Sequence, residues 1–90
     1  MTREIIEATA NGKSFSVSGK VAKTLKALVK AGRKGVTALE LSNTWALRLG
    51  HYVFVLRREH GLAIITRREE HDGGWHGRYE LLDTVEILTS

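Results

Sequence analysis

The sequence predicts a single α+β domain in which three helices lie between two β-hairpins. The pair Asn11-Gly12 separates two short segments in which apolar and polar residues alternate, as in a hairpin with a two-residue turn. Apolar residues then recur at helical spacing over 19–31 and again over about 45–60. The segment 62–68 is rich in β-branched residues, and 78–82 is its expected partner in a second hairpin. A chain of 90 residues has room for one domain with one modest core.

The first hairpin spans 3–18, and its turn fixes the register of the two strands. Counting outward from the turn gives three facing pairs: Ala10 with Lys13, Ala8 with Phe15, and Ile6 with Val17. One face is then apolar, and we expect it to be buried. The other face is polar apart from Ile5.

A first helix is predicted over 19–31, with Ser18 as its N-cap and Gly32 as its C-terminal cap. One side of it is an apolar stripe made of Val21, Ala22, Leu25, Leu28 and Val29. Lysines occupy the rest of its surface: Lys20, Lys23, Lys26 and Lys30.

A short second helix is expected to begin at Ala38 and to end by Asn43. Thr37 and Glu40 have the spacing of a capping box, in which each side chain binds the free backbone N–H of the other residue. Val36 and Leu41 stand where a hydrophobic staple forms. The polar run 42–44 then favours a new helix start.

The third helix is predicted from about Trp45 to His60 and is followed by Gly61. Its expected inner side carries Ala46, Leu49, Val53 and Leu56. Its expected outer side carries Thr44, Arg48, His51, Val55 and Arg58. A glycine inside a helix costs about 1 kcal/mol relative to alanine, so Gly50 predicts a close approach to a neighbouring element.

The second hairpin is expected to end in a long glycine-containing loop over 69–77. The tail 83–90 follows it. Residues 85–88 are apolar enough for a short strand, whose expected partner is the N-terminal hairpin.

The composition excludes several classes of site. Without cysteine, the chain has no disulfide, thiolate zinc site or cysteine nucleophile. Its four histidines match no recognised ligand spacing, so we expect no metal. We find no phosphate-binding glycine loop, nucleophile elbow or paired carboxylates, so we expect no enzyme activity, no catalytic residue, no cofactor and no small-molecule substrate.

The net charge indicates the kind of partner, and the apolar stretches and the first residues indicate the compartment. A formal charge of +4 favours a polyanion, because clustered cations release counterions when they neutralise phosphates. No apolar stretch approaches the roughly 20 residues of a membrane span, and Met1-Thr2-Arg3-Glu4 lacks the apolar core of a secretion signal. We therefore expect a cytoplasmic protein without a membrane partner.

The order of elements over about 19–82 resembles the winged helix-turn-helix superfamily. More narrowly, the chain resembles small bacterial and prophage-type winged-helix domains with an N-terminal β-hairpin. Two stretches carry the resemblance: Gly35-Val36-Thr37-Ala38-Leu39-Glu40 and Gly73-Gly74-Trp75-His76-Gly77-Arg78-Tyr79. The resemblance implies binding of double-stranded DNA, as a transcriptional regulator or a DNA-architecture factor. The helix at about 45–60 would enter the major groove, and the second hairpin, the wing, would touch the backbone or the minor groove.

Transferred to this sequence, the resemblance nominates a set of DNA-contacting residues. On the helix they are Thr44, Trp45, Arg48, His51 and Arg58; on the wing they are Arg67, Arg68, Trp75, His76 and Arg78; and Lys34 is a backbone contact. Arg48 would bind the O6 and N7 of a guanine. Trp75 has two interpretations, since it would either stack on a base or anchor the loop onto the core.

The third helix is more apolar than a DNA-reading helix usually is. Leu47, Phe54 and Val55 point away from the predicted core and predict a protein interface. We expect a homodimer, which would bind two DNA half-sites. The alternative function is a protein-interaction module that uses this apolar face. Acidic residues at the wing tip, Glu69, Glu70 and Asp72, would repel phosphates if they faced the duplex.

Overall fold

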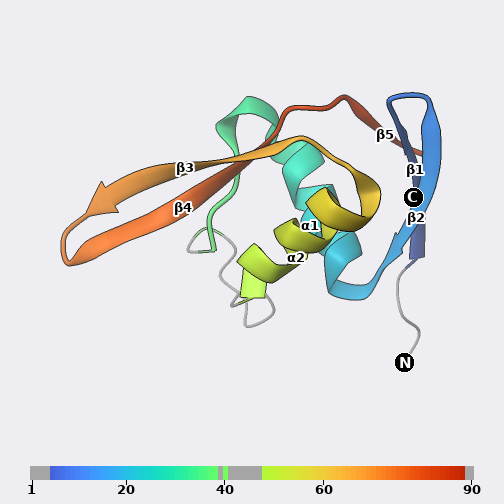
Figure 1. The fold of residues 1–90 in the computed structure, drawn as a ribbon. Helices are drawn as coiled ribbons and strands as arrows, with labels where there is room; N and C mark the ends of the chain where they lie inside the picture. The colour runs from blue at the N-terminus through green and yellow to red at the C-terminus, as the bar shows by residue number, and fades with distance from the viewer. Residues whose placement is uncertain (1–4, 39, 41–47, 89–90) are drawn as a thin grey trace.

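A computed structural model describes residues 5–38, 40 and 48–88. Within them, two α-helices lie between a three-stranded sheet and a long β-hairpin that projects away from the helices (Figure 1). The elements, in chain order, are β1 (Ile5–Ala10), β2 (Lys13–Ser18), α1 (Gly19–Ala31), the 3₁₀ helix η1 (Gly32–Lys34), α2 (Leu49–His60), β3 (Ile64–His71), β4 (Gly74–Leu81) and β5 (Val85–Ile87). Neither α-helix of these described ranges is long and apolar enough to cross a membrane.

The first hairpin forms as the sequence predicts. Asn11 and Gly12 have φ values of 55° and 78°, the positive angles that this tight turn requires. The observed register is the predicted one, with Ala8 opposite Phe15. The tail strand β5 pairs with β1, giving the sheet order β2-β1-β5, so the predicted partner of the tail is also confirmed.

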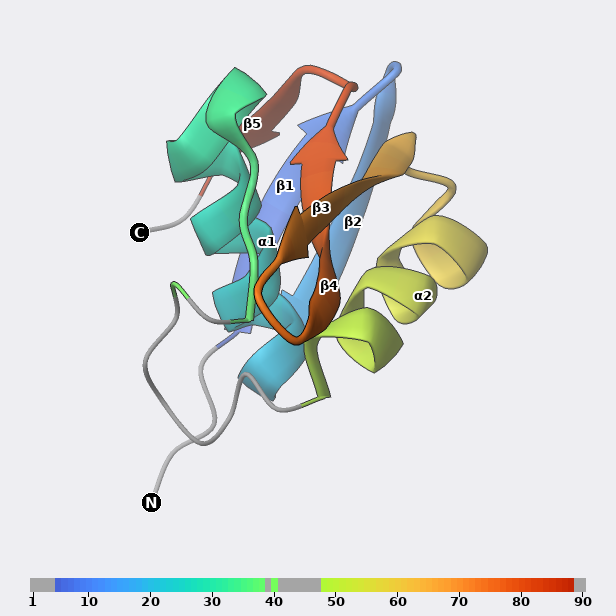
Figure 2. The same cartoon turned by 90° about the vertical axis from the view of Figure 1, so that its left-hand side faces the viewer.

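The core lies between the inner face of this sheet and the two helices. Figure 2, viewed from the hairpin end, shows both helices in front of the sheet. The predicted stripes supply the most buried side chains of each element: Ile6, Ala8 and Val17 from the sheet, Ala22, Leu25 and Leu28 from α1, and Leu49, Val53 and Leu56 from α2. Thr24 is also buried, and its hydroxyl donates to the carbonyl oxygen of Lys20 at 2.9 Å.

One predicted cap does not form as expected. Ser18 occupies the N-cap position of α1, but its side chain makes no capping hydrogen bond. The physical reason is that Ser18 is still the last residue of β2, opposite Ile5, and the chain turns into the helix through Gly19 at φ 61°.

The predicted count of three helices is wrong for the described residues, which contain two α-helices. The capping box itself is present: Thr37 N–H donates to Oε1 of Glu40, and Glu40 N–H donates to Oγ1 of Thr37, both at 3.2 Å. Ala38 and Glu40 lie in a turn, and the remainder of the segment expected to be helical, with Leu41 of the staple, lies outside the described residues. The last predicted helix corresponds to α2, which begins at Leu49 rather than at Trp45.

The predicted loop over 69–77 is also wrong. The strands β3 and β4 continue through it, pairing in register as far as His71 opposite Gly74, so the turn is Asp72-Gly73. Gly73 takes a φ of 90°, which a glycine adopts without steric cost. The hairpin is therefore a long, regular ribbon.

A third segment joins this ribbon. Val36 and Tyr79 exchange two backbone hydrogen bonds of 2.8 and 2.9 Å, which bridges the chain after η1 to the outer edge of β4. The preceding residue, Gly35, has a φ of 73°. A Cβ atom there would lie 2.7 Å from the carbonyl oxygen of Tyr79, so only glycine allows this approach.

Replacing Gly35 should therefore destabilise the domain more than replacing another glycine at positive φ. Gly35→Ala is expected to lower the free energy of unfolding by about 2 to 3 kcal/mol, through backbone strain and the contact with Tyr79. Gly61→Ala is the matched control, because Gly61 has a φ of 65° but open space around it. Its loss should be about 1 kcal/mol. Equal losses in urea titrations would show that the close approach contributes nothing.

Candidate nucleic-acid interface

The two faces of the β3–β4 hairpin contact different elements. Successive side chains of a strand point to opposite faces, so the register assigns each residue to one of them. Arg57 of α2 donates from Nε to the carbonyl oxygen of Ile64 at 2.7 Å and from Nη2 to Oγ1 of Thr66 at 2.8 Å. We call the face with Thr66 the α2 side; it comprises Ile64, Thr66, Arg68, Glu70, Trp75, Gly77, Tyr79 and Leu81. The opposite face, with Arg67 and Arg78, is the η1 side.

Tyr79 joins the α2 side of the hairpin to the helix itself. Its ring packs against the core. A Cβ atom at Gly50 of α2 would lie 3.1 Å from the Tyr79 hydroxyl oxygen, and one at Gly77 would lie 3.6 Å from it. Gly50 thus leaves space for the hydroxyl group, whereas the distance from Gly77 is that of an ordinary contact. The close approach that the sequence predicted at Gly50 is confirmed.

Farther along the α2 side, Arg68 and Trp75 form a pair. The guanidinium carbon of Arg68 lies 4.8 Å from the ring centroid of Trp75, within range of a cation–π interaction. Trp75 is 55% exposed, so the interpretation in which it anchors a loop onto the core is wrong. Arg68 also faces Glu70 at 3.8 Å, a weak pair between two exposed side chains.

The outer side of α2 presents cationic and aromatic groups. Arg48, at the N-cap position, and His51 are exposed, and Arg48 makes no ion pair with any residue in the described ranges. The Arg58 guanidinium lies 5.9 Å from the ring centroid of Phe54, which is 53% exposed. Val55 is half-buried. The other helix residues nominated from the sequence, Thr44, Trp45 and Leu47, lie outside the described residues.

On the η1 side, the arginines are bound to the protein itself. Arg67 pairs with Glu80 at 3.0 Å and donates to the carbonyl oxygen of Arg33 at 3.3 Å. Arg78 donates from Nε to Oε2 of Glu69 at 2.6 Å. It also donates from Nη1 and Nη2 to the two carboxylate oxygens of Glu40 at 3.0 and 3.2 Å. The carbonyl oxygens of Lys34 and Gly35, at 3.2 and 3.4 Å from Nη1, complete this set.

These contacts, which we call the Arg78 cluster, shift the pKa values of its carboxylates. The hydrogen bonds from Arg78 hold the pKa of Glu40 below its ordinary value, with the Thr37 N–H as a further donor. The same guanidinium lowers the pKa of Glu69, helped by His76, whose Nε2 lies 3.0 Å from Oε1 of Glu69. The pKa of Arg78 is raised in turn by both carboxylates.

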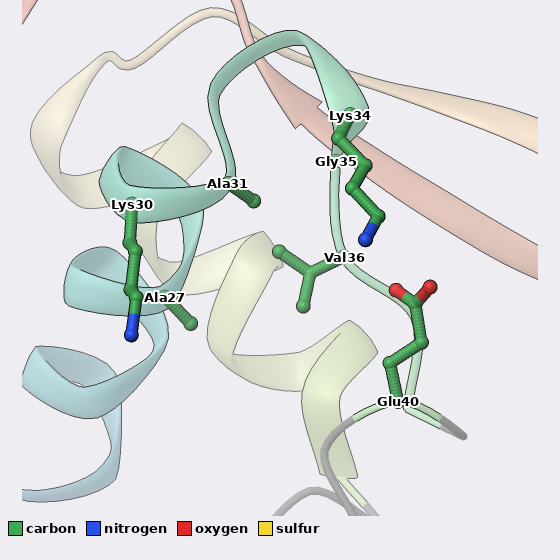
Figure 3. Close-up of a pocket in the computed structure, with 7 residues that line it drawn as sticks. All are labelled: Ala27, Lys30, Ala31, Lys34, Gly35, Val36 and Glu40. Atoms are coloured by element: carbon green, nitrogen blue, oxygen red, sulfur yellow. The ribbon is translucent and has the colours of Figure 1, made fainter.

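A cavity of about 420 Å³ lies beside the Arg78 cluster, between the end of α1 and the turn at 35–40 (Figure 3). Ala27, Ala31 and Val36 form its apolar lining, and Lys30 and Lys34 stand at its edge. The Lys34 side chain points toward the Glu40 carboxylate. Lys34 therefore lies with the η1 side of the hairpin, away from the exposed arginine of the α2 side.

Residues 14–90 match a protein family described as a winged helix domain. The chain belongs to the winged-helix family. DNA binding is the general activity that a winged-helix domain suggests, and such domains are typically not enzymes. No curated protein and no solved structure matches the chain.

In this winged-helix domain, β3 and β4 are the wing, and the fold brings together only part of the predicted interface. Arg48, His51 and Arg58 share the outer side of α2, and Arg68 and Trp75 lie on the wing face that is turned toward α2. The other nominated residues within the described ranges are on the η1 side or next to it: Lys34, Arg67, His76 and Arg78.

Sequence reasoning missed the residues that hold the wing in place. Arg57 and Tyr79 fix the α2 side, and Glu40 and Glu69 fix the η1 side. The signal that would have helped is Asp72-Gly73, a strong hairpin turn pair. Placing the turn there fixes the register and assigns every wing residue to a face.

The Arg78 cluster should make stability depend on pH in the acid range. Because the folded-state pKa values of Glu40 and Glu69 lie below their ordinary 4.5, their contribution is complete above that pH. It is lost as the pH falls through the lowered folded-state values. The double variant Glu40→Gln/Glu69→Gln should therefore be less stable at pH 7 and lose less stability between pH 5 and pH 3. If the free energy of unfolding, measured in urea, fell equally with pH in parent and variant, Glu40 and Glu69 would not be the source of the pH dependence.

Proposed function

We propose that this winged-helix domain binds double-stranded DNA, with α2 and the residues before it in the major groove and the wing on the adjacent backbone or minor groove. One observation carries the proposal. The exposed cations of α2 and the Arg68–Trp75 pair belong to neighbouring elements, which are joined by the hydrogen bond between Arg57 and Thr66. A duplex in contact with the outer side of α2 would then extend to the wing.

The chemistry of each group suits a different part of the duplex. Arg48 lies at the N-terminal end of α2, where a recognition helix contacts base edges, and its guanidinium can bind a guanine through two hydrogen bonds. His51, on the same side, is suited to a base edge or a phosphate. Arg68 is suited to a phosphate or a narrow minor groove, and the exposed ring of Trp75 supports it.

The acidic side chains of the wing favour the same orientation at Glu69 but oppose it at Glu70. Glu69 is bound to Arg78 on the η1 side. Glu70 lies on the α2 side, 3.8 Å from Arg68, where its charge opposes phosphate binding. Arg67 and Arg78 make short contacts with carboxylates and are poor candidates for phosphate contacts, whereas the contact of Arg68 with Glu70 is long and exposed. As the biological role we propose, from the family resemblance, a small transcriptional regulator or DNA-architecture factor of the bacterial cytoplasm or a prophage.

Fluorescence anisotropy with a labelled duplex of mixed sequence tests the proposal. The logarithm of the binding constant should fall linearly with the logarithm of the salt concentration. Arg68→Met should weaken binding and lower that slope by about one, as the loss of a phosphate contact does. Arg48→Met should also weaken binding but should change the slope less, because the proposed contact of Arg48 is to a base. Lys13→Met removes the same charge from β2, at the opposite end of the molecule, and should change the slope little. Binding that is absent, or insensitive to salt, would refute the proposed function.

A second candidate is suggested by Phe54, which is 53% exposed on the outer side of α2. An aromatic ring so exposed on the helix suits a protein interface. With Leu47 and Val55, it would form the homodimer contact, or the contact of a protein-interaction module.

Sedimentation velocity of the parent and of Phe54→Asp distinguishes these possibilities. If Phe54 forms a homodimer contact, the parent should sediment as a dimer and the variant as a monomer. Thr66→Asp, which places the same charge on the wing, is a control for the added charge. A parent that is monomeric at all accessible concentrations would rule out the homodimer.

A further inference from the structure

The wing extends well beyond its contacts with the helices. Thr66 and Tyr79 are opposite each other in the ribbon, and among the described residues they are the outermost pair in contact with α2. Five further pairs follow before the turn, from Arg67 opposite Arg78 to His71 opposite Gly74. A two-stranded ribbon without other support is marginally stable in water. The orientation of its outer part must therefore come from contacts on its η1 side.

Arg78 supplies most of those contacts. Its side chain is 15% exposed, and Nε, Nη1 and Nη2 all donate to acceptors of the protein. One acceptor, Glu69, lies on the wing itself. The others, Glu40 and the carbonyl oxygens of Lys34 and Gly35, lie on the chain between α1 and α2. A guanidinium with this many partners has little capacity left for a phosphate.

Glu40 connects the Arg78 cluster to the capping box. Its Oε1 accepts from the Thr37 N–H at 3.2 Å and from Nη1 of Arg78 at 3.0 Å. The same carboxylate thus closes the capping box and binds the wing. The wing is thereby fixed to the segment that leads toward α2, at a distance of 38 residues along the chain.

We infer that Arg78 is a positioning residue for DNA binding: through Glu40 and Glu69 it holds the wing at the angle at which Arg68 and Trp75 reach the duplex bound by α2. The inference rests on the proposed function. The resemblance nominated Arg78 as a DNA contact. In this inference Arg78 instead holds the wing in place and makes no contact with a phosphate.

Glu40→Gln is the most informative variant. Glutamine also serves in a capping box, so the turn is retained while the charged pair with Arg78 is lost. The variant also removes a negative charge, which by electrostatics alone would tighten binding to DNA. Positioning predicts the opposite sign: binding should weaken, by about tenfold, and the salt slope should fall by no more than about one, because the phosphate contact of Arg68 is lost when the wing moves. Glu59→Gln, an exposed residue of α2 outside the cluster, controls for the charge.

Arg78→Met provides the second comparison, measured in the same anisotropy titrations. If Arg78 acts by positioning Arg68, Arg78→Met made in the parent should weaken binding, but it should not lower the salt slope further in an Arg68→Met background. A further loss of slope of about one in that background would identify a direct phosphate contact of Arg78 and overturn the inference. Unchanged or tighter binding by Glu40→Gln would also overturn it.

A measurement without DNA keeps the inference separate from the proposed function. ¹⁵N relaxation of the free protein should show larger-amplitude motion of the amides of 68–77 in Glu40→Gln than in the parent, with the amides of β1 and β2 unchanged. Equal wing motion in both proteins would contradict the positioning role, even if the parent bound no DNA at all. If the parent bound no DNA but the wing loosened as expected, the proposed function alone would fail.

Discussion

The arrangement of the domain depends on Tyr79. Its backbone exchanges two hydrogen bonds with Val36, and its hydroxyl group fits beside Gly50 and Gly77. One residue thus fixes the wing to the chain that follows η1 and to the helix α2. Glycine is required at Gly35, since a Cβ atom there would collide with the carbonyl oxygen of Tyr79. The geometry between wing and helix, on which any shared binding surface depends, follows from this packing.

The two faces of the wing differ in their contacts: the η1 side binds the rest of the protein, and the outer part of the α2 side is exposed. On the η1 side, the arginines are satisfied by carboxylates and by carbonyl oxygens at the end of η1, where backbone acceptors are available. On the α2 side, the outer residues are Arg68 and Trp75, whose guanidinium and ring stack on each other and stay accessible. Whether an arginine of the wing is available to a ligand therefore depends on its face. The arginines of the η1 side are paired with carboxylates of the protein, and Arg68 on the α2 side is accessible.

Much of the fold follows from local sequence signals, and much of the interface does not. Asn11-Gly12 sets the first hairpin, helical spacing sets α1, and Gly50 points to a close contact that Tyr79 makes. The wing was misjudged because its glycines suggested a loop, although Asp72-Gly73 marks a turn between two full strands. The role of Arg78 could not be predicted, because its partner Glu40 is 38 residues away and only the folded chain brings them together. Exposed groups such as Arg48 have no such long-range requirement, and the resemblance to winged-helix domains was enough to nominate them.

The most direct test of a shared surface is an NMR titration of the ¹⁵N-labelled domain with a short DNA duplex. If α2 and the wing act as one DNA-binding surface, amide shifts should change along the outer side of α2 and around Arg68 and Trp75 at the same DNA concentration. The amides of β1, β2 and β5, behind the helices, should be unaffected. Shifts confined to that sheet, or to the wing without α2, would contradict this account.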